Sequence, residues 1–248
     1  FEDETHINTF AQIEYIMSYT FLNTRNFNKS LYHLSKLTEL MLRNDIVKLN
    51  YQGKHIAIQS FIQVFNHQID EAIESIESFL LKEKNKISIQ TELNLSLNLS
   101  GYLITVGAYS KAIKILNFMS ESDKYYQKEM GREWLIRKEM IFCIVQTSLG
   151  NTELSLKILS SIEKKHSDML SIDQYSMVSP FIHLIRNYIN NPHEANIDNL
   201  IQFENNLALN KNKVFRDPRL IIFYAWLRSQ YVKKGAYDIL IEEYLIIE

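Results

Sequence analysis

The chain has 248 residues, of which 46% are hydrophobic and 23% are charged, a balance typical of a folded globular protein. Its 27 basic and 29 acidic residues give a net charge of -2, so no strong overall field would attract nucleic acid or an acidic membrane surface. With only 6 Gly and 3 Pro, the chain lacks the turn chemistry that a large β-sandwich or α/β barrel requires. These bounds favour an all-α fold.

The first predicted elements are two helical hairpins that share one pattern of apolar and small residues. In the first hairpin, Phe27 opens the second helix and the small residue Ser30 follows three positions later. In the second hairpin, Ile69 and Ala72 occupy the same relative positions. A small residue at such a position lets two helices cross closely, so we expect each pair to pack tightly.

The third copy of the pattern, between Leu97 and Met119, is the clearest. Gly107 stands at the turn between two helices, Tyr109 follows it, and Ala112 takes the small position. Glycine tolerates the left-handed backbone that commonly ends a helix. Replacing Ala112 with a larger residue should therefore overpack the helix crossing.

The later part of the chain continues the pattern with less regularity. A turn at Gly150 precedes Ser155, and Leu240 is a weaker last member. Between them, residues 175–190 and 197–207 form two further predicted helices without a recognisable small residue. Ser30, Ala72, Ala112 and Ser155 are spaced 42, 40 and 43 residues apart, and Leu240 lies 85 residues further on, close to two periods. The sequence therefore predicts about six hairpins.

The spacing of Gly107, Tyr109 and Ala112 resembles the tetratricopeptide repeat (TPR). The segments 131–135 and 223–227 are similar to the C-terminal part of a group of bacterial TPR-like proteins, most of them without an assigned function. The resemblance implies an all-α, right-handed superhelical α-solenoid of about six TPR-like hairpins, forming a single domain over 1–248. The repeats are longer than the 34 residues of the standard unit. Because the chain begins at Phe1, we expect it to be a fragment of a longer protein.

Candidate chemistry is sparse, and the sequence predicts no catalytic residue, cofactor or metal site. No two histidines stand four residues apart on one helix, and the six glycines form no phosphate-binding loop. The single Cys143 lies within an apolar run at a packing position, which indicates a buried thiol in a reducing compartment. No apolar stretch approaches the roughly 18 residues that span a bilayer, and no signal peptide is visible, so we expect a cytoplasmic protein.

The inner wall of a TPR-like stack is built from the first helix of each hairpin, and partner peptides lie across it. The resemblance places eight residues on this predicted wall: Tyr15, Tyr19, Lys54, Phe61, Asn94, Thr105, Arg137 and Lys233. This mixture of aromatic, amide and cationic groups suits an extended or helical peptide with an acidic end. A surface of mixed polarity without any binding role explains the same residues equally well.

The leading hypothesis for function is a noncatalytic scaffold that binds a protein or peptide segment of unknown identity on this concave wall. An alternative is a sensor or regulatory domain of a larger bacterial signalling or transcription-regulating protein. A third possibility, an enzyme, would gain support from a closed pocket with clustered titratable groups.

Overall fold

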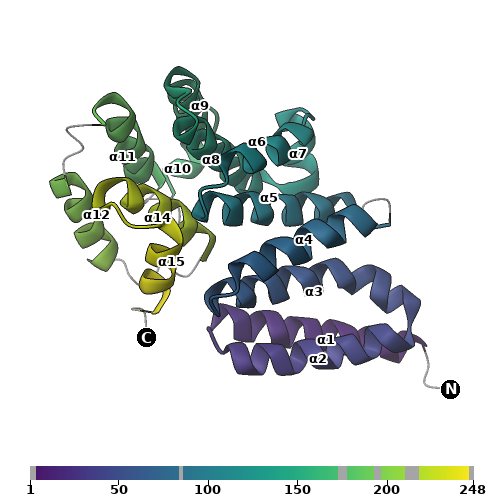
Figure 1. The fold of residues 1–248 in the computed structure, drawn as a ribbon. Coiled ribbons are helices and arrows are strands. Elements are labelled where there is room, and N and C mark those ends of the chain that lie inside the picture. The colour runs from purple at the N-terminus through teal and green to yellow at the C-terminus, as the bar shows by residue number, and fades with distance from the viewer. Residues whose placement is uncertain (1–3, 84–85, 173–177, 193–196, 210–217, 246–248) are drawn as a thin grey trace. The chain divides into compact units, whose positions relative to one another are not determined.

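The computed structural model describes residues 4–83, 86–172, 178–192, 197–209 and 218–245. Within these ranges every regular element is an α-helix (Figure 1), which confirms the all-α prediction. None of the helices described is long and apolar enough to cross a membrane.

The chain divides into two compact units, Phe1–Tyr102 and Leu103–Glu248. The first unit contains α1 (Glu4–Asn23), α2 (Phe27–Arg43), α3 (Asp45–Phe65), α4 (Ile69–Glu83) and most of α5 (Ile89–Thr105). The second contains α6 (Tyr109–Phe118), α7 (Asp123–Met130), α8 (Arg132–Ser148), α9 (Thr152–Lys165), α10 (Ser167–Leu170), α11 (Val178–Asn190), α12 (Ile197–Leu209), α14 (Pro218–Val232) and α15 (Ala236–Leu245). Helices pack mainly against their neighbours in sequence, most extensively in the pairs α1–α2, α3–α4, α8–α9 and α14–α15.

Several of these helices begin at a side-chain cap. Asn26 accepts a hydrogen bond from Lys29 N at the start of α2, and Asn44 accepts one from Val47 N at the start of α3. Ser122 caps α7 in the same way. Each cap satisfies a backbone N–H that has no partner within the helix, which contributes on the order of 1 kcal/mol.

The turn between the two helices of a pair has the same backbone geometry four times. One residue in each turn has a left-handed backbone, and the N–H that follows it donates to a carbonyl five residues earlier, at 2.8–2.9 Å. The left-handed residues are Arg25, His67, Gly107 and Gly150. The sequence marked only the two glycines, because Arg25 and His67 adopt this conformation despite a strain of about 1–2 kcal/mol each.

The predicted small residues are all buried, and Ser30 and Ser155 lie where two helices cross. Ser30, Ala72, Ala112 and Ser155 are each 0% exposed. Ser30 Oγ donates to the carbonyl of Ser18 on α1 at 2.8 Å, and Ser18 Oγ donates back to the carbonyl of Ser30 at 3.0 Å. Side chains this short reach the opposite backbone only where two helices approach closely, so the small residues set the spacing of the pair.

Each small residue has a counterpart twelve positions earlier in the preceding helix. These counterparts are Ser18, Ser60, Ser100 and Cys143, and all four are 0% exposed. Ser155 Oγ donates to the Cys143 carbonyl at 3.3 Å, which repeats in α8 and α9 the Ser18–Ser30 contact of α1 and α2. Of these four, only Cys143 is indicated as a packing residue by the sequence pattern.

The last pair departs from the pattern. The N–H of Ile239 donates to the Gly235 carbonyl at 3.1 Å, the bond that Ser30 and Ser155 make in their own helices. Ile239 and the predicted Leu240 are both buried in α15, at 2% and 0% exposed, and neither is a small residue. In the preceding pair, α11 begins at Val178, and the first three residues of the helix predicted over 175–190 lie outside the described residues.

Substituting Ala112→Leu tests the role of the small position. The added side chain has no free volume at a fully buried site, so we expect the free energy of unfolding to fall by about 1–3 kcal/mol. The measurement is urea denaturation followed by circular dichroism. Lys111→Leu, at the exposed neighbouring position of α6, is the control and should change stability by less than about 0.5 kcal/mol.

A second close approach joins α3 to α5 at Gly53, and the substitution Gly53→Ala tests it. A Cβ atom there would lie 2.1 Å from Thr91 Cγ2, so we expect a loss of about 1–3 kcal/mol in urea denaturation despite the better helix propensity of alanine. Thr91→Ser deletes the obstructing methyl and keeps the hydroxyl that bonds Ser88. The double variant should recover the loss, and failure to do so would show that Gly53 is needed for another reason.

Candidate functional site

Three residues of the predicted wall meet in the first unit. Tyr15 and Tyr19 lie one turn apart on α1 with ring centroids separated by 6.1 Å. Lys54 Nζ on α3 lies 5.1 Å from the Tyr15 ring centroid and 4.7 Å from that of Tyr51. The Tyr15 and Tyr51 rings are themselves 5.8 Å apart. We call Tyr15, Tyr19, Tyr51 and Lys54 the Lys54 cluster.

Tyr51 is not among the predicted wall residues, although it stands three residues before Lys54. Positions three apart on a helix share a face, so the spacing could have identified it. Its ring lies between α1 and α3 and contacts both Tyr15 and Lys54. The structure thus adds a third phenol to the predicted set.

The cluster combines a positive charge with hydroxyl donors on an aromatic base. Tyr19 is 42% exposed and Lys54 is exposed, whereas Tyr15 and Tyr51 are half-buried. Burial raises the pKa of Tyr15 above its usual value, as it does the pKa of Tyr51, so both phenols keep their protons at neutral pH. The ammonium over the rings gains on the order of 0.5–1 kcal/mol from each such contact at an exposed site.

The other predicted wall residues do not extend this cluster. Phe61 packs inward, with its ring 4.7 Å from Phe65 and against the core of the first unit. Asn94 is exposed on α5. In the second unit, Thr105 is only 4% exposed, so its side chain is largely inaccessible to a partner. Arg137 is half-buried within α8. Lys233 lies just after α14, where it is exposed and has a left-handed backbone.

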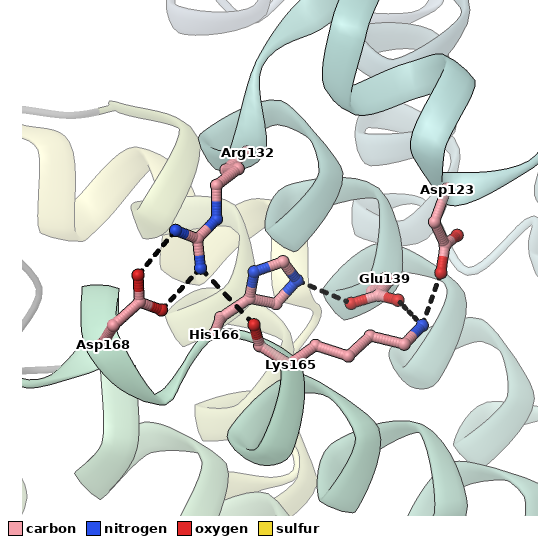
Figure 2. Close-up of polar contacts among 6 residues, drawn as sticks. All are labelled: Asp123, Arg132, Glu139, Lys165, His166 and Asp168. Carbon is pink, nitrogen blue, oxygen red and sulfur yellow. Dashed lines mark hydrogen bonds and ion pairs between the residues drawn. The ribbon is translucent and has the colours of Figure 1, made fainter.

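A second concentration of charged side chains lies in the second unit, where α7, α8, α9 and α10 meet (Figure 2). Arg132, the first residue of α8, donates to both carboxylate oxygens of Asp168 on α10, at 2.7 and 2.6 Å. The same guanidinium donates to the carbonyl of Lys165 at 3.4 Å, at the end of α9. This bidentate pair therefore joins the start of α8 to the turn after α9.

Lys165 continues the network toward α7. Its ammonium contacts the carboxylate of Asp123 on α7 and lies 3.3 Å from Glu139 Oε1 on α8. The second oxygen of Glu139 faces His166, with 3.5 Å between Oε2 and the imidazole Nε2. The repeat pattern of the sequence predicts neither α7 nor α10 as a separate helix, so it gives no sign that these six residues lie together.

Burial and pairing lower the pKa values of three groups in or beside the network. Desolvation lowers the pKa of His166, whose side chain is 3% exposed, so the ring is neutral at pH 7. Hydrogen bonds from Arg132 lower the pKa of Asp168 to about 2. Nearby, burial lowers the pKa of Lys138, whose ammonium lies 4.4 Å from the Tyr126 ring centroid.

The network binds helices together and presents no accessible base. Its exposed charges, Lys165, Asp123 and Asp168, are held in ion pairs, and the imidazole of His166 is shielded from solvent. Among the described residues, no group of three or more His, Cys, Asp or Glu side chains could hold a metal ion. The clustered titratable groups therefore give no support to the enzyme hypothesis.

Cys143 is buried, in agreement with the prediction. Its thiol is 0% exposed, and burial raises its pKa to about 12. A thiol that stays protonated and enclosed is a poor nucleophile, so its contact with Ser155 at the helix crossing accounts for its position.

Comparison with known proteins finds no relative: no family model matches this sequence, and no curated protein or solved structure gives a significant match.

The buried imidazole of His166 gives a test of the network by pH. Because its pKa is lowered in the folded state, the folded protein resists protonation, and stability should fall as pH drops below the unfolded value of about 6.5. An NMR titration should place the His166 pKa below 6.5. Glu139→Gln removes the carboxylate that favours the imidazolium and should lower this pKa further, whereas Glu153→Gln, exposed on α9, should leave it unchanged. A rise in Glu139→Gln would contradict the assigned contact.

Proposed function

We propose that this protein is a noncatalytic TPR-like scaffold, a right-handed superhelical stack of about six helical hairpins. It binds a protein or peptide segment along the wall made by the first helix of each hairpin. Two local features support the repeat. The turn with a left-handed residue occurs four times, and each time it is accompanied by two buried small residues that lie twelve positions apart. Repeats of this kind cannot bury their apolar faces alone, and stacking supplies the missing contact surface.

The observation that carries the binding proposal is the Lys54 cluster. Tyr15, Tyr19 and Lys54 were selected from the repeat frame alone, and they contact one another across α1 and α3. Aromatic rings and a cation gathered on one exposed surface are typical of binding hot spots, because rigid rings lose little conformational entropy on binding.

The chemistry of the cluster favours a partner segment that carries a carboxylate. The ammonium of Lys54 is exposed, and its contacts described above are to ring faces, not to an acidic side chain. A carboxylate placed beside it would accept hydrogen bonds from the ammonium and from a neighbouring phenol. The tyrosine rings would meanwhile cover an apolar side chain of the same segment.

Selection of a displayed library of random peptides against the full chain tests this proposal. Peptides that bind the wall should carry acidic residues, and Lys54→Glu should weaken them by at least about tenfold through like-charge repulsion. Lys48→Glu makes the same charge change at another exposed position of α3 and should alter affinity by less than about twofold. Equal affinities of the two variants, or the absence of any enriched peptide, would contradict the proposal.

A further inference from the structure

The solvent-facing side of α2 carries a stripe of basic side chains. Lys29, Lys36 and Arg43 follow one another at intervals of seven residues, so at 100° per residue they fall within an arc of about 40°. Tyr32, which is 58% exposed, borders this arc, and Lys36 Nζ lies 5.7 Å from the centroid of its ring. Glu39 is the single acidic residue of α2. We call Lys29, Tyr32, Lys36 and Arg43 the α2 basic face.

The solvent-facing side of α4 has the opposite charge. Asp70, Glu71, Glu74 and Glu77 are all exposed and fall within an arc of about 120°. Lys82 lies at the edge of this arc, in the last turn of the helix. We call the four carboxylates the α4 acidic face.

Neither face is neutralised by the chain itself. Lys29 Nζ lies 5.2 Å from the centroid of the Phe21 ring on α1, and Lys36 contacts Tyr32, so both cations lie against rings. Among the residues that the structure describes, no ion pair involves a cation of the α2 basic face or a carboxylate of the α4 acidic face. Two oppositely charged surfaces of the first unit therefore face solvent without a partner.

The exposure of these faces does not depend on where the chain begins. Ser30 and Ala72 relate α2 to α4 by 42 residues, so Lys29 matches Glu71 and Tyr32 matches Glu74. α4 follows a complete hairpin and precedes α5, and the matching side of α4 is still exposed. This side of the second helices is thus not the surface through which hairpins stack.

Charge and spacing identify a second copy of this chain as the occupant of both faces. Lys29 and Lys36 are seven residues apart on α2, as are Asp70 and Glu77 on α4, so each pair spans about 10.5 Å along its helix axis. Two helices laid side by side can therefore bring both cations next to carboxylates at once. Each face repels a copy of itself and attracts the other, which favours contact between unlike faces.

We propose that copies of this chain associate by placing the α2 basic face of one copy against the α4 acidic face of another. Tyr32 and Leu81, which is 86% exposed within the acidic arc of α4, add apolar surface to this contact. Single exposed ion pairs are weak, so the association depends on several of them forming together. The Lys54 cluster lies on first helices, and the contact does not depend on peptide binding.

Sedimentation velocity of the full chain over a concentration series tests the proposal. The unmodified protein should associate, and Lys29→Glu with Lys36→Glu should raise the dissociation constant by at least about tenfold, because like charges would then meet. Lys111→Glu with Lys114→Glu makes the same charge change at exposed positions of α6 and should alter the constant by less than about twofold. Equal effects of the two double variants, or a monomer at every concentration even if the α2 basic face binds some other protein, would overturn the proposal.

A charge exchange separates loss of the contact from loss of the fold. Glu74→Lys with Glu77→Lys, beyond the first turn of α4, should also weaken self-association by at least about tenfold. Mixing this variant with Lys29→Glu and Lys36→Glu protein should restore association, because the reversed α2 face then meets the reversed α4 face. A mixture that stays monomeric, although both variants keep the helical circular dichroism of the unmodified protein, would show that the two faces do not meet.

Salt provides an arm that needs no variant. Raising the salt concentration from about 0.05 M to about 0.5 M shortens the screening length between exposed charges. The dissociation constant of the unmodified protein should therefore rise at least about tenfold. An association that salt leaves unchanged, or strengthens, would contradict a contact between these faces.

Discussion

The close crossing of two helices at a pair of small residues is the constraint on which the rest of this structure depends. Ser18 and Ser30 each reach the carbonyl of the other, and Cys143 and Ser155 repeat the arrangement 125 residues later in the chain. A larger side chain at either position would separate the helices and open space that the core could not fill. The left-handed turn residue acts with this pair, because it reverses the chain within a few residues and brings the two small positions into line.

The helix crossings also determine which residues of α1 and α3, the first helices of two successive hairpins, come into contact. α3 packs against both α1 and α2. The register of α3 relative to α1 places Tyr51 and Lys54 beside Tyr15. The Lys54 cluster is thus a consequence of hairpin stacking and needs no separate turn or loop. The same register relates Ile16 of α1, which is exposed, to Ile58 of α3, which is buried in the core with Leu34 and Leu37 of α2.

The Arg132–Asp168 network has a different origin. It arises where the connections between hairpins are long enough to form α7 and α10, and it attaches those helices to α8 and α9. Its members are spread from position 123 to 168 and have no spacing rule in common, so periodicity could not reveal them. The burial of His166 follows from this attachment, and it makes the ring a structural group with lowered proton affinity.

The sequence by itself determined the helical class, the two glycine turns and the small residues, because each depends on interactions between residues close together in the chain. Gly107, Gly150 and Ala112 are examples, since backbone freedom and side-chain volume are properties of the residue itself. Only the tertiary structure decided that Arg25 and His67 adopt the glycine-like turn and that Thr105 is buried. It also decided which charges meet, because Asp123, Glu139 and Lys165 come together through the packing of α7, α8 and α9. Packing can override a local preference when the contacts it forms are worth more than the strain.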